Sequence, residues 1–454
     1  MSTKEKAVNQ ITEGVIWKQL LFFFFPIMLG TLFQQLYNTA DAVVVGRFVG
    51  TRALAAVGGS TGQMVNLIVG FFVGLSSGAT VIIARYYGAK NKKDLNDTLH
   101  TAAGLSVAGG ILITIAGILF TPSMLKIMKT PADVMADSAT YLRIYFGGII
   151  FVFIYNVGSA ILRAVGDSTR PLYFLIVCCF INIFLDVLLV VGFNMGVAGA
   201  AIATVVSQAV SAVLVIWALL KSTDMYCLHP KEIRFHKFLL VSIITIGLPA
   251  GIQSVMYNLA NMIIQTSLND LGTSTMAAYT AFGKIDAIYW MISGAFSVSI
   301  TTFIGQNYGA QKYDRMKKSV KICLFMDFLA SILVSALLLF FGEYLLRLFT
   351  TDPEVLKVGM KIIHIIAPSY VLFIFIEILS STLRGIGNVL VPMLMTCGGV
   401  CILRIIWIFF VVPHRPGVSN ILLCYPISWG LTAVLFILYY YTQQKKFFHA
   451  HQQI

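Results

Sequence analysis

Long apolar stretches recur along the whole sequence, and each is long enough to cross a membrane as a helix. A spanning helix needs about 20 mostly apolar residues. Twelve segments meet that length, roughly at 16–45, 53–82, 98–121, 136–161, 170–192, 196–220, 238–266, 275–304, 319–342, 357–382, 388–412 and 418–442. The sequence therefore predicts an all-α, polytopic membrane protein with twelve transmembrane helices.

The composition excludes several other classes of protein. The mean hydropathy is +0.85 and only 11% of the residues are charged, which is about half the share in an ordinary soluble domain. A water-soluble enzyme or a nucleic-acid-binding protein is therefore not expected. The net charge is +13, but the basic residues fall in short clusters between apolar segments. The seven cysteines lie almost all within apolar segments and lack the spacing of metal ligands.

The distribution of basic residues predicts the orientation in the membrane. The termini and the even-numbered connections carry 21 Lys and Arg, against 8 on the opposite side. Because cytoplasmic loops are enriched in basic residues, both termini are expected in the cytoplasm. The N-terminus does not resemble a cleavable signal peptide, since its charged residues precede an apolar run that is too long.

The two halves of the chain repeat each other. Four short motifs recur at nearly constant offsets. At an offset of 221, Leu162–Asp167 matches Leu383–Asn388, Tyr87–Ala89 matches Tyr308–Ala310 and Gly196-Val197 matches Gly417-Val418, while an offset of 223 relates Pro26 to Pro249. The chain is predicted to be a duplication of six helices, with an N-terminal lobe at 1–220, a charged cytoplasmic linker at 221–237 and a C-terminal lobe with a short tail at 238–454. Six is an even number, so the two repeats are parallel and are expected to enclose a central cleft.

A polar stripe in the span 16–45 ends in a carboxylate. Gln34, Tyr37 and Asn38 precede Asp41 at spacings of seven, four and three, which place them on one face of a helix. An acid inside a membrane span usually has a functional role. The alternative is a packing stripe with Asp41 in the headgroup region.

A second carboxylate lies in the span 170–192. Asn182 and Asp186 are one helical turn apart, and Asp186 is expected at the same depth as Asp41. Two carboxyls in a poorly solvated pocket do not both ionise easily, so the pair is expected to hold a proton, or to bind a hard monovalent cation together with amide and hydroxyl oxygens. Tyr141, Asn156 and Thr204 are candidates to complete either site.

The second lobe has different polar residues. Ile264 and Trp407 occupy the positions of Asp41 and Asp186, and Glu377 matches Asn156. An uncharged stripe is formed by Gln253, Tyr257, Asn261 and Gln265, and charges within spans are found at Lys284, Asp286 and Arg404. These three charges either form interhelical ion pairs or face the substrate cleft. No role is assigned to Asp327.

Four motifs in chain order resemble the multidrug and toxic compound extrusion (MATE) transporters. They are Asn38–Asp41 with Gly46, Leu162–Pro171, Asn182–Asp186 and Gly196–Thr204. The resemblance covers essentially the whole chain. It implies a secondary antiporter that exports organic, cationic or amphipathic compounds in exchange for H⁺ or Na⁺ by alternating access.

The resemblance also implies where the sites lie. The cation site of the DinF-like branch falls on Asp41, Asn182, Asp186 and Thr204, with Tyr141 and Asn156 nearby. The NorM-like branch has an acid in its seventh helix, where this chain has neutral Asn261 and its neighbours. The substrate cleft is expected to include Gln34, Tyr37, Asn38, Gln253, Tyr257, Asn261, Lys284, Asp286 and Arg404.

The expected partners follow from the same reasoning. We expect a monomer in the cell membrane with a small-molecule substrate, and no cofactor besides the coupling ion H⁺ or Na⁺. The chain has no Walker-type phosphate loop, and neither ATP, nucleic acid nor a resident metal other than Na⁺ is expected. The alternatives are a flippase for lipids or lipid-linked precursors, an exporter of a zwitterionic or anionic metabolite, and a receptor or scaffold that transports nothing.

Overall fold

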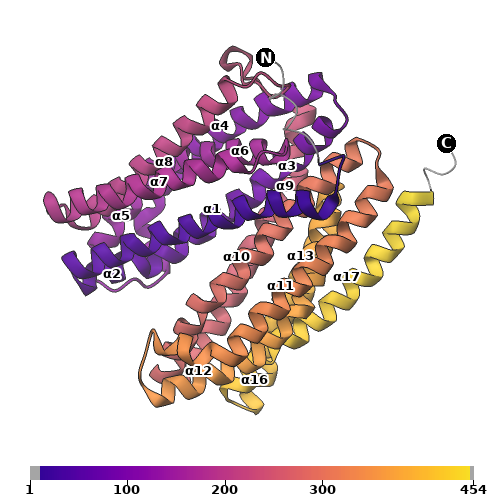
Figure 1. Cartoon of the computed structure of the whole chain (residues 1–454). Coiled ribbons are helices and arrows are strands. Elements are labelled where there is room, and N and C mark those ends of the chain that lie inside the picture. The colour runs from indigo at the N-terminus through magenta and orange to yellow at the C-terminus, as the bar shows by residue number, and fades with distance from the viewer. Residues whose placement is uncertain (1–10, 450–454) are drawn as a thin grey trace. The chain divides into compact units, whose positions relative to one another are not determined.

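The computed structural model describes residues 11–449, in which all regular structure is helical (Figure 1). Lys4 and Lys6 and the side chains of Lys445 and Lys446, which entered the orientation count, lie outside the described residues. Eleven helices in this range are long and apolar enough to cross a membrane, and a twelfth span forms if α5 (Met135–Gly147) and α6 (Ile149–Ala164), bent by 48° at Gly148, are taken as one. The predicted all-α fold with twelve spans is confirmed.

The described chain separates into two compact units, and the first contains residues 22–251. Its helices follow the order of the predicted spans. In addition to α5 and α6 they are α1 (Ile16–Val44), η1 (Val45–Val49), α2 (Thr51–Gly58), α3 (Ser60–Gly88), α4 (Lys92–Ile127), α7 (Thr169–Asp186), η2 (Val187–Gly192), α8 (Gly196–Leu220), η3 (Pro230–Glu232) and the first part of α9 (Lys237–Asn269). Within this unit α6 packs against α3, α4 and α8, and α7 packs against α8.

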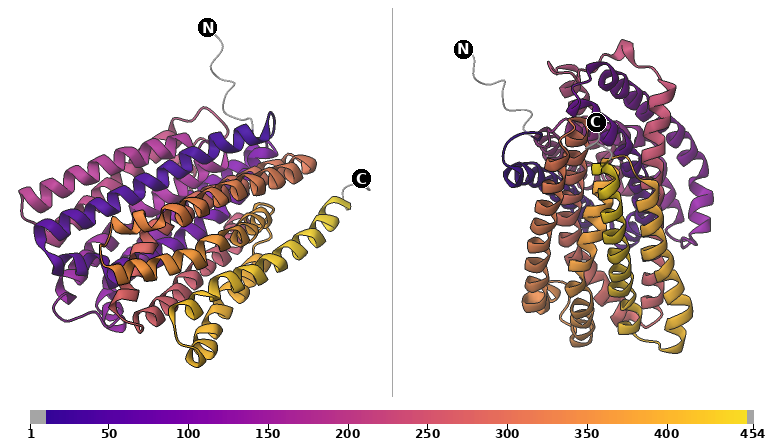
Figure 2. Two further views of the ribbon diagram at one scale, coloured as in Figure 1. Left: turned by 60° about the horizontal axis from the view of Figure 1, so that its bottom comes forward. Right: turned by 90° about the vertical axis from the view of Figure 1, so that its right-hand side faces the viewer.

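The second unit contains residues 11–21 and 252 onward. After the rest of α9 its helices are α10 (Thr273–Gly309), α11 (Tyr313–Arg347), α12 (Pro353–Ile366), η4 (Ala367–Ser369), α13 (Tyr370–Gly385), α14 (Leu390–Thr396), η5 (Cys397–Ile402), α15 (Leu403–Ile406), η6 (Trp407–Val411), η7 (Val412–His414), α16 (Val418–Leu422) and α17 (Cys424–His449). Helices α10, α11 and α13 lie side by side, and α17 packs on α13 (Figure 2).

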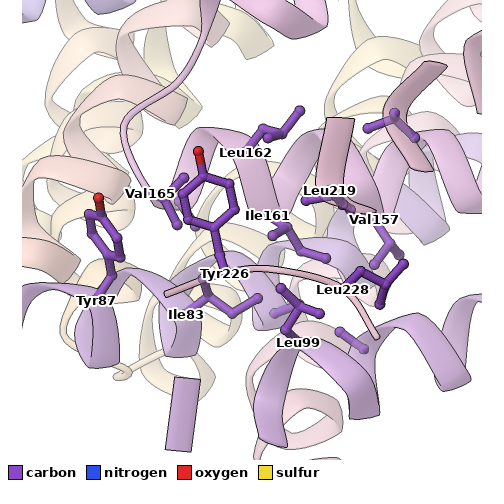
Figure 3. Close-up of a cluster of buried hydrophobic side chains, with 14 of the residues drawn as sticks. Ile83, Tyr87, Leu99, Val157, Ile161, Leu162, Val165, Leu219, Tyr226 and Leu228 are labelled. Carbon is purple, nitrogen blue, oxygen red and sulfur yellow. The ribbon is translucent and has the colours of Figure 1, made fainter. Parts of the chain in front are cut away.

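The segment 221–236, which joins α8 to α9, is packed onto the first unit. Tyr226 and Leu228 enter a buried apolar cluster with Ile83, Leu99 and Leu162 (Figure 3). The Tyr87 hydroxyl donates to Asp224 over 2.8 Å. The charged segment that connects the repeats therefore has a defined structure and packs against the first unit.

Glycines bring α3 and α9 into backbone contact within the first unit. A Cβ on Gly74 would lie 2.5 Å from the nitrogen of Gly251, and one on Gly78 would lie 2.2 Å from the carbonyl oxygen of Ile243 and 2.8 Å from the nitrogen of Gly247. Each helix thus presents two small residues four positions apart, which is the arrangement that lets membrane helices approach closely.

The motif repeated in the two halves is a helix C-terminal cap. Gly166 has φ +101° and Gly387 has φ +84°, a left-handed conformation that glycine adopts without a Cβ penalty. The N–H of Asp167 donates to the carbonyl of Leu162, and Asn388 bonds Leu383 in the same way, both over 2.9 Å. The two repeats therefore preserve the geometry with which the chain leaves α6 and α13.

The N-terminal segment is fastened to the start of α11. Arg315 donates from Nε to the carbonyl of Ile11 over 3.0 Å and from its terminal nitrogens to the carbonyls of Glu13 and Gly14. Lys312 donates to the carbonyl of Thr12 over 2.9 Å. Lys312 and Arg315 thus bind protein backbone, and residues 11–21 belong to the second unit although they come before residue 22, where the main part of the first unit begins.

Candidate cation site and aromatic pocket

The two acids of the first unit stand where regular helix gives way to a wider helical turn. Helix α1 ends at Val44, three residues after Asp41, and continues as the π-helix η1. Asp186 is the last residue of α7, and the π-helix η2 begins at Val187. Such π-turns are rare and often occur at functional sites. Both carboxyls therefore lie at places where the helical hydrogen-bond ladder changes register.

The carboxyl groups of Asp41 and Asp186 meet inside the unit. Asp41 is 6% exposed and Asp186 and Asn182 are fully buried. The Asp41 carboxyl lies close to the Asp186 carboxyl and the Asn182 amide, without a regular hydrogen bond to either. The Thr204 hydroxyl of α8 is 3.2 Å from Asp41 Oδ2. Helices α1, α7 and α8 thus bring together the four residues that the sequence placed in one cation site.

This cluster contains more acceptors than donors. Asp41 Oδ1, both carboxyl oxygens of Asp186 and both amide atoms of Asn182 are buried without a well-aligned hydrogen bond in the described part of the chain. No Lys or Arg there forms a salt bridge with either acid. Buried carboxylates without a cationic partner are unfavourable by several kcal/mol. A proton or a small hard cation held between the oxygens removes that penalty.

The other first-lobe candidates divide into two groups. Tyr141 is buried, and its hydroxyl lies within reach of Thr204, so it belongs to the wall of the cluster. Asn156 is half-buried and donates to the carbonyl of Val152 on its own helix over 2.8 Å. One N–H of its amide is therefore used within α6, and no hydrogen bond from Asn156 to either acid is found among the described residues.

The polar stripe of α1 is narrower than its spacing predicts. Tyr37 is 4% exposed and accepts from Gln208 of α8 over 3.1 Å, with Gln34 within reach of its hydroxyl. Asn38 is exposed and its amide is 3.5 Å from Gln35. Because three-residue steps fall 60° short of a full turn, Asn38 stands at the edge of the stripe and outside the buried cluster.

Gln208 was not identified from the sequence as a site residue. It follows Thr204 by four positions on α8 and therefore shares its face. This four-residue spacing is the sequence pattern from which Gln208 could have been predicted as a site residue.

The second unit has its own cavity, of about 260 Å³, with aromatic walls. Its lining includes Tyr279, Lys284, Trp290, Tyr425 and Trp429. Asp286 also lines it and is held by neutral donors. The Trp290 indole donates to one carboxyl oxygen over 2.7 Å, and the Tyr370 hydroxyl donates to the other. The position of Trp290 four residues after Asp286 was a usable sequence signal for this contact.

The three charges predicted in the second lobe do not pair with one another. Lys284 is exposed, and neither it, Asp286 nor Arg404 forms a salt bridge within residues 11–449. Arg404 is 2% exposed, and its guanidinium lies 4.0 Å from the centroid of the Tyr425 ring and 5.3 Å from that of Trp429. Lys284 and Asp286 therefore line the cavity, whereas Arg404 does not line it and stacks on two of its wall residues.

The uncharged stripe of α9 is only partly buried. Gln253 is 8% exposed, and the Tyr257 hydroxyl is buried without a partner among the described residues. Asn261 is exposed, while Gln265 lines the aromatic cavity. The four residues of the stripe therefore do not share one environment.

One group of side chains has the composition of a metal site but serves another purpose. His100, His229 and Glu232 place ligand atoms within 4.8 Å of one another. The Nδ1 of His100 is hydrogen-bonded to the Asn96 carbonyl over 2.7 Å. Its Nε2 accepts a hydrogen bond from the backbone N–H of His229 over 2.9 Å. Both ring nitrogens are occupied by these hydrogen bonds, so His100 holds the connecting segment rather than a metal.

Twelve apolar spans, a six-helix duplication and a buried acidic cluster define a polytopic membrane transporter. The MatE family model matches this chain twice, over residues 26–188 and 249–410. The chain therefore belongs to the MatE family, the MATE transporters, as its motifs predicted. The two matches also confirm the duplication.

Curated relatives and solved structures agree with this assignment. The chain is 29% identical over 456 residues to the probable multidrug resistance protein YoeA of Bacillus subtilis, with 98% of each chain covered. It is 28% identical over 393 residues to the probable multidrug resistance protein YpnP of the same organism, with 87% of this chain and 88% of the relative covered. The outward-facing structure of a multidrug resistance MATE family transporter shares the fold, with a TM-score of 0.90 at 22% identity over 98% of this chain and 99% of that one.

Proposed function

We propose that this protein exports organic compounds in exchange for H⁺ or Na⁺, and that Asp41 and Asp186 bind the coupling ion. The observation that carries the proposal is the contact between two buried carboxyls with no basic partner among the described residues. Such a pair is stable when a cation is bound and unfavourable when it is empty. Its occupancy is therefore able to bias a conformational equilibrium.

Coupling requires that the ion and the exported compound favour different conformations. Helix α1 provides a mechanical link, because Asp41 lies near its end and Pro26 lies inside it. Proline removes one rung of the helical hydrogen-bond ladder. A Cβ on Gly30 would lie 3.1 Å from Leu175 of α7, so a bend near Pro26 changes the packing between the helices that carry the two acids.

The cargo is proposed to be cationic or amphipathic. The aromatic cavity with Asp286 supports this choice, since aromatic faces and a carboxylate both attract organic cations. In this proposal the chain works as a single copy in the cell membrane without ATP, with both termini in the cytoplasm.

A second candidate is the export of a zwitterionic or anionic compound. It is favoured by Lys284, which is exposed in the same cavity and forms no ion pair among the described residues. Competition between ethidium and a set of zwitterionic and anionic aromatic compounds discriminates the two. Inhibition by the anions alone would favour this second candidate.

The coupling proposal is tested by ethidium efflux in vesicles with an imposed pH or Na⁺ gradient. Asp41→Asn is expected to abolish gradient-driven efflux. Asp133→Asn changes an exposed acid of the same unit and is expected to leave efflux unchanged. An Asp41→Asn protein that exports at the normal rate would end the assignment.

A further inference from the structure

One face of α11 is a polar stripe inside the second unit. Ser319, Cys323, Asp327, Ser331 and Ser335 recur at every fourth position, and all are less than 8% exposed. A spacing of four keeps side chains on one side of a helix. This side faces protein rather than lipid, because α10, α12 and α13 pack against α11.

The neighbouring helices present hydroxyl groups to this stripe. The hydroxyl of Tyr289, on α10, lies within reach of Ser293 and Ser331, and it donates to the carbonyl of Tyr370 over 3.2 Å. The Ser335 hydroxyl donates to the carbonyl of Ala367 in η4 over 2.6 Å. The stripe is therefore part of a buried polar layer between α10, α11 and α13.

Asp327 is the acid at the centre of this layer. It is fully buried, and neither of its carboxyl oxygens has a hydrogen-bond partner among the described residues. Ser293 and Ser331, each 1% exposed, also have hydroxyls without an assigned partner there. Three buried polar side chains of α10 and α11 thus have unused hydrogen-bonding capacity within the second unit.

The ionisable groups that interact directly with Asp327 carry no positive charge. They are Glu377 on α13, Tyr289 on α10 and Cys323 on its own helix, and the cation Arg384 of α13 interacts with Glu377. Neither α12 nor η4 supplies a salt bridge to it within the described chain. An ionised carboxylate is strongly disfavoured in such surroundings, whereas a neutral carboxyl is tolerated.

We propose that Asp327 is a second proton-binding site, located in the interior of the second unit and separate from the Asp41–Asp186 pair. The carboxyl holds its proton while α10, α11 and α13 enclose it. It releases the proton to water when these helices separate, and the hydroxyl of Ser331, one helical turn away on α11, is available as a donor to the carboxylate that remains. This deepens the proposed antiport function, because it adds a titrating group in the unit where the first pair has no counterpart.

Infrared difference spectroscopy between low and high pH tests the site without any cargo. The full chain in lipid nanodiscs is expected to show a protonated-carboxyl band that disappears reversibly at high pH. One component of this band is expected to be lost in Asp327→Asn and retained in Asp41→Asn and Asp186→Asn. Ser331→Ala is expected to shift the band, because it removes a buried hydroxyl one helical turn from the carboxyl on the same face of α11.

Three results would overturn the proposal. The first is an unchanged difference spectrum in Asp327→Asn. The second is an Asp327 band that does not respond to pH, which would make the group a permanently neutral packing residue. The third is loss of the band on adding Na⁺ at constant pH, which would identify a sodium site. If Asp327→Asn does not elute as a single species on size exclusion, the shift in Ser331→Ala decides, and its absence overturns the proposal.

A second measurement connects the site to transport. Proton release on ethidium binding is followed with a pH-indicator dye in weakly buffered detergent solution. Asp327→Asn is expected to release fewer protons per ethidium than the unsubstituted chain, and equal release would contradict a coupled role. A chain that does not bind ethidium would argue against the proposed function, while the infrared result would still report on Asp327.

Discussion

The two units descend from one six-helix repeat, but their interiors differ in what they hold. In the first, Asp41 and Asp186 meet at the ends of α1 and α7. In the second unit the matching positions are occupied by Ile264 and Trp407. Ile264 is fully buried, and the indole of Trp407 donates to the carbonyl of Asn420 over 2.8 Å. The comparison teaches that duplication preserved the helix caps, where backbone geometry constrains the residue, while the polar interior diverged.

The second unit carries its acids elsewhere. Asp286 lines an aromatic cavity and accepts from Trp290 and Tyr370, and Asp327 is enclosed between α10, α11 and α13. Neither position corresponds to an acid of the first unit. The two halves are therefore expected to respond differently to the same kind of substitution, and the following predictions test that difference in order of decreasing effect.

The largest difference is expected at the matched pair Asp186 and Trp407. Asp186→Asn should reduce gradient-driven ethidium efflux about 100-fold, because the amide cannot exchange a proton or neutralise a bound cation. Trp407→Phe should change efflux less than about threefold, since it removes one hydrogen bond worth about 1 kcal/mol. Initial rates in vesicles at equal protein content measure both. Similar losses in the two variants would show that the units share the coupling role.

The next effect concerns the close approach of α3 and α9 in the first unit. Gly78→Val should lower the free energy of unfolding by about 3 kcal/mol, because the new Cβ would overlap the backbone of Ile243 and Gly247. Gly283→Ala in α10 is the control, since open space surrounds its Cβ position. Thermal unfolding followed by size exclusion reports the difference. Equal stability of Gly78→Val and the control would mean that the helices do not pack through these glycines.

A smaller effect is expected in the aromatic cavity of the second unit. Asp286→Asn should weaken ethidium binding about tenfold, or about 1.4 kcal/mol, because one carboxylate near the cation is lost. The ion dependence of binding should not change, since that dependence is assigned to the Asp41–Asp186 pair and to Asp327 rather than to Asp286. Fluorescence titration at several Na⁺ concentrations and pH values measures both quantities. Loss of the ion dependence in this variant would move part of the coupling to Asp286.

The smallest effect is one that the two units should share. Gly166→Ala and Gly387→Ala should each cost about 1 kcal/mol, because both glycines have a positive φ that alanine adopts with strain. The expected change in melting temperature is therefore small and similar in the two variants. A large loss in one unit only would show that its cap has an additional role beyond ending the helix.

Much of the candidate site was accessible from sequence because it rests on helical spacing. Asn182 and Asp186 share a face by their four-residue separation, and Thr204 leads to Gln208 by the same rule. The exposure of Asn38 could not be predicted from the sequence, because it depends on how much of the polar face of α1 the neighbouring helices cover. The same holds for Asn156, whose amide is used by its own helix.

The sequence by itself determined the spans, the duplication and the caps, because each depends on local properties: apolar length, a recurring motif and the conformational freedom of glycine. Only the tertiary structure decided which polar side chains meet. Asp41 and Asp186 lie 145 positions apart in sequence. The role proposed for Asp327 depends on its burial between α10 and α13, which helical spacing alone does not predict. Contacts between distant segments depend on how helices pack, and helical periodicity fixes the face of a residue but not the neighbour that the face will touch.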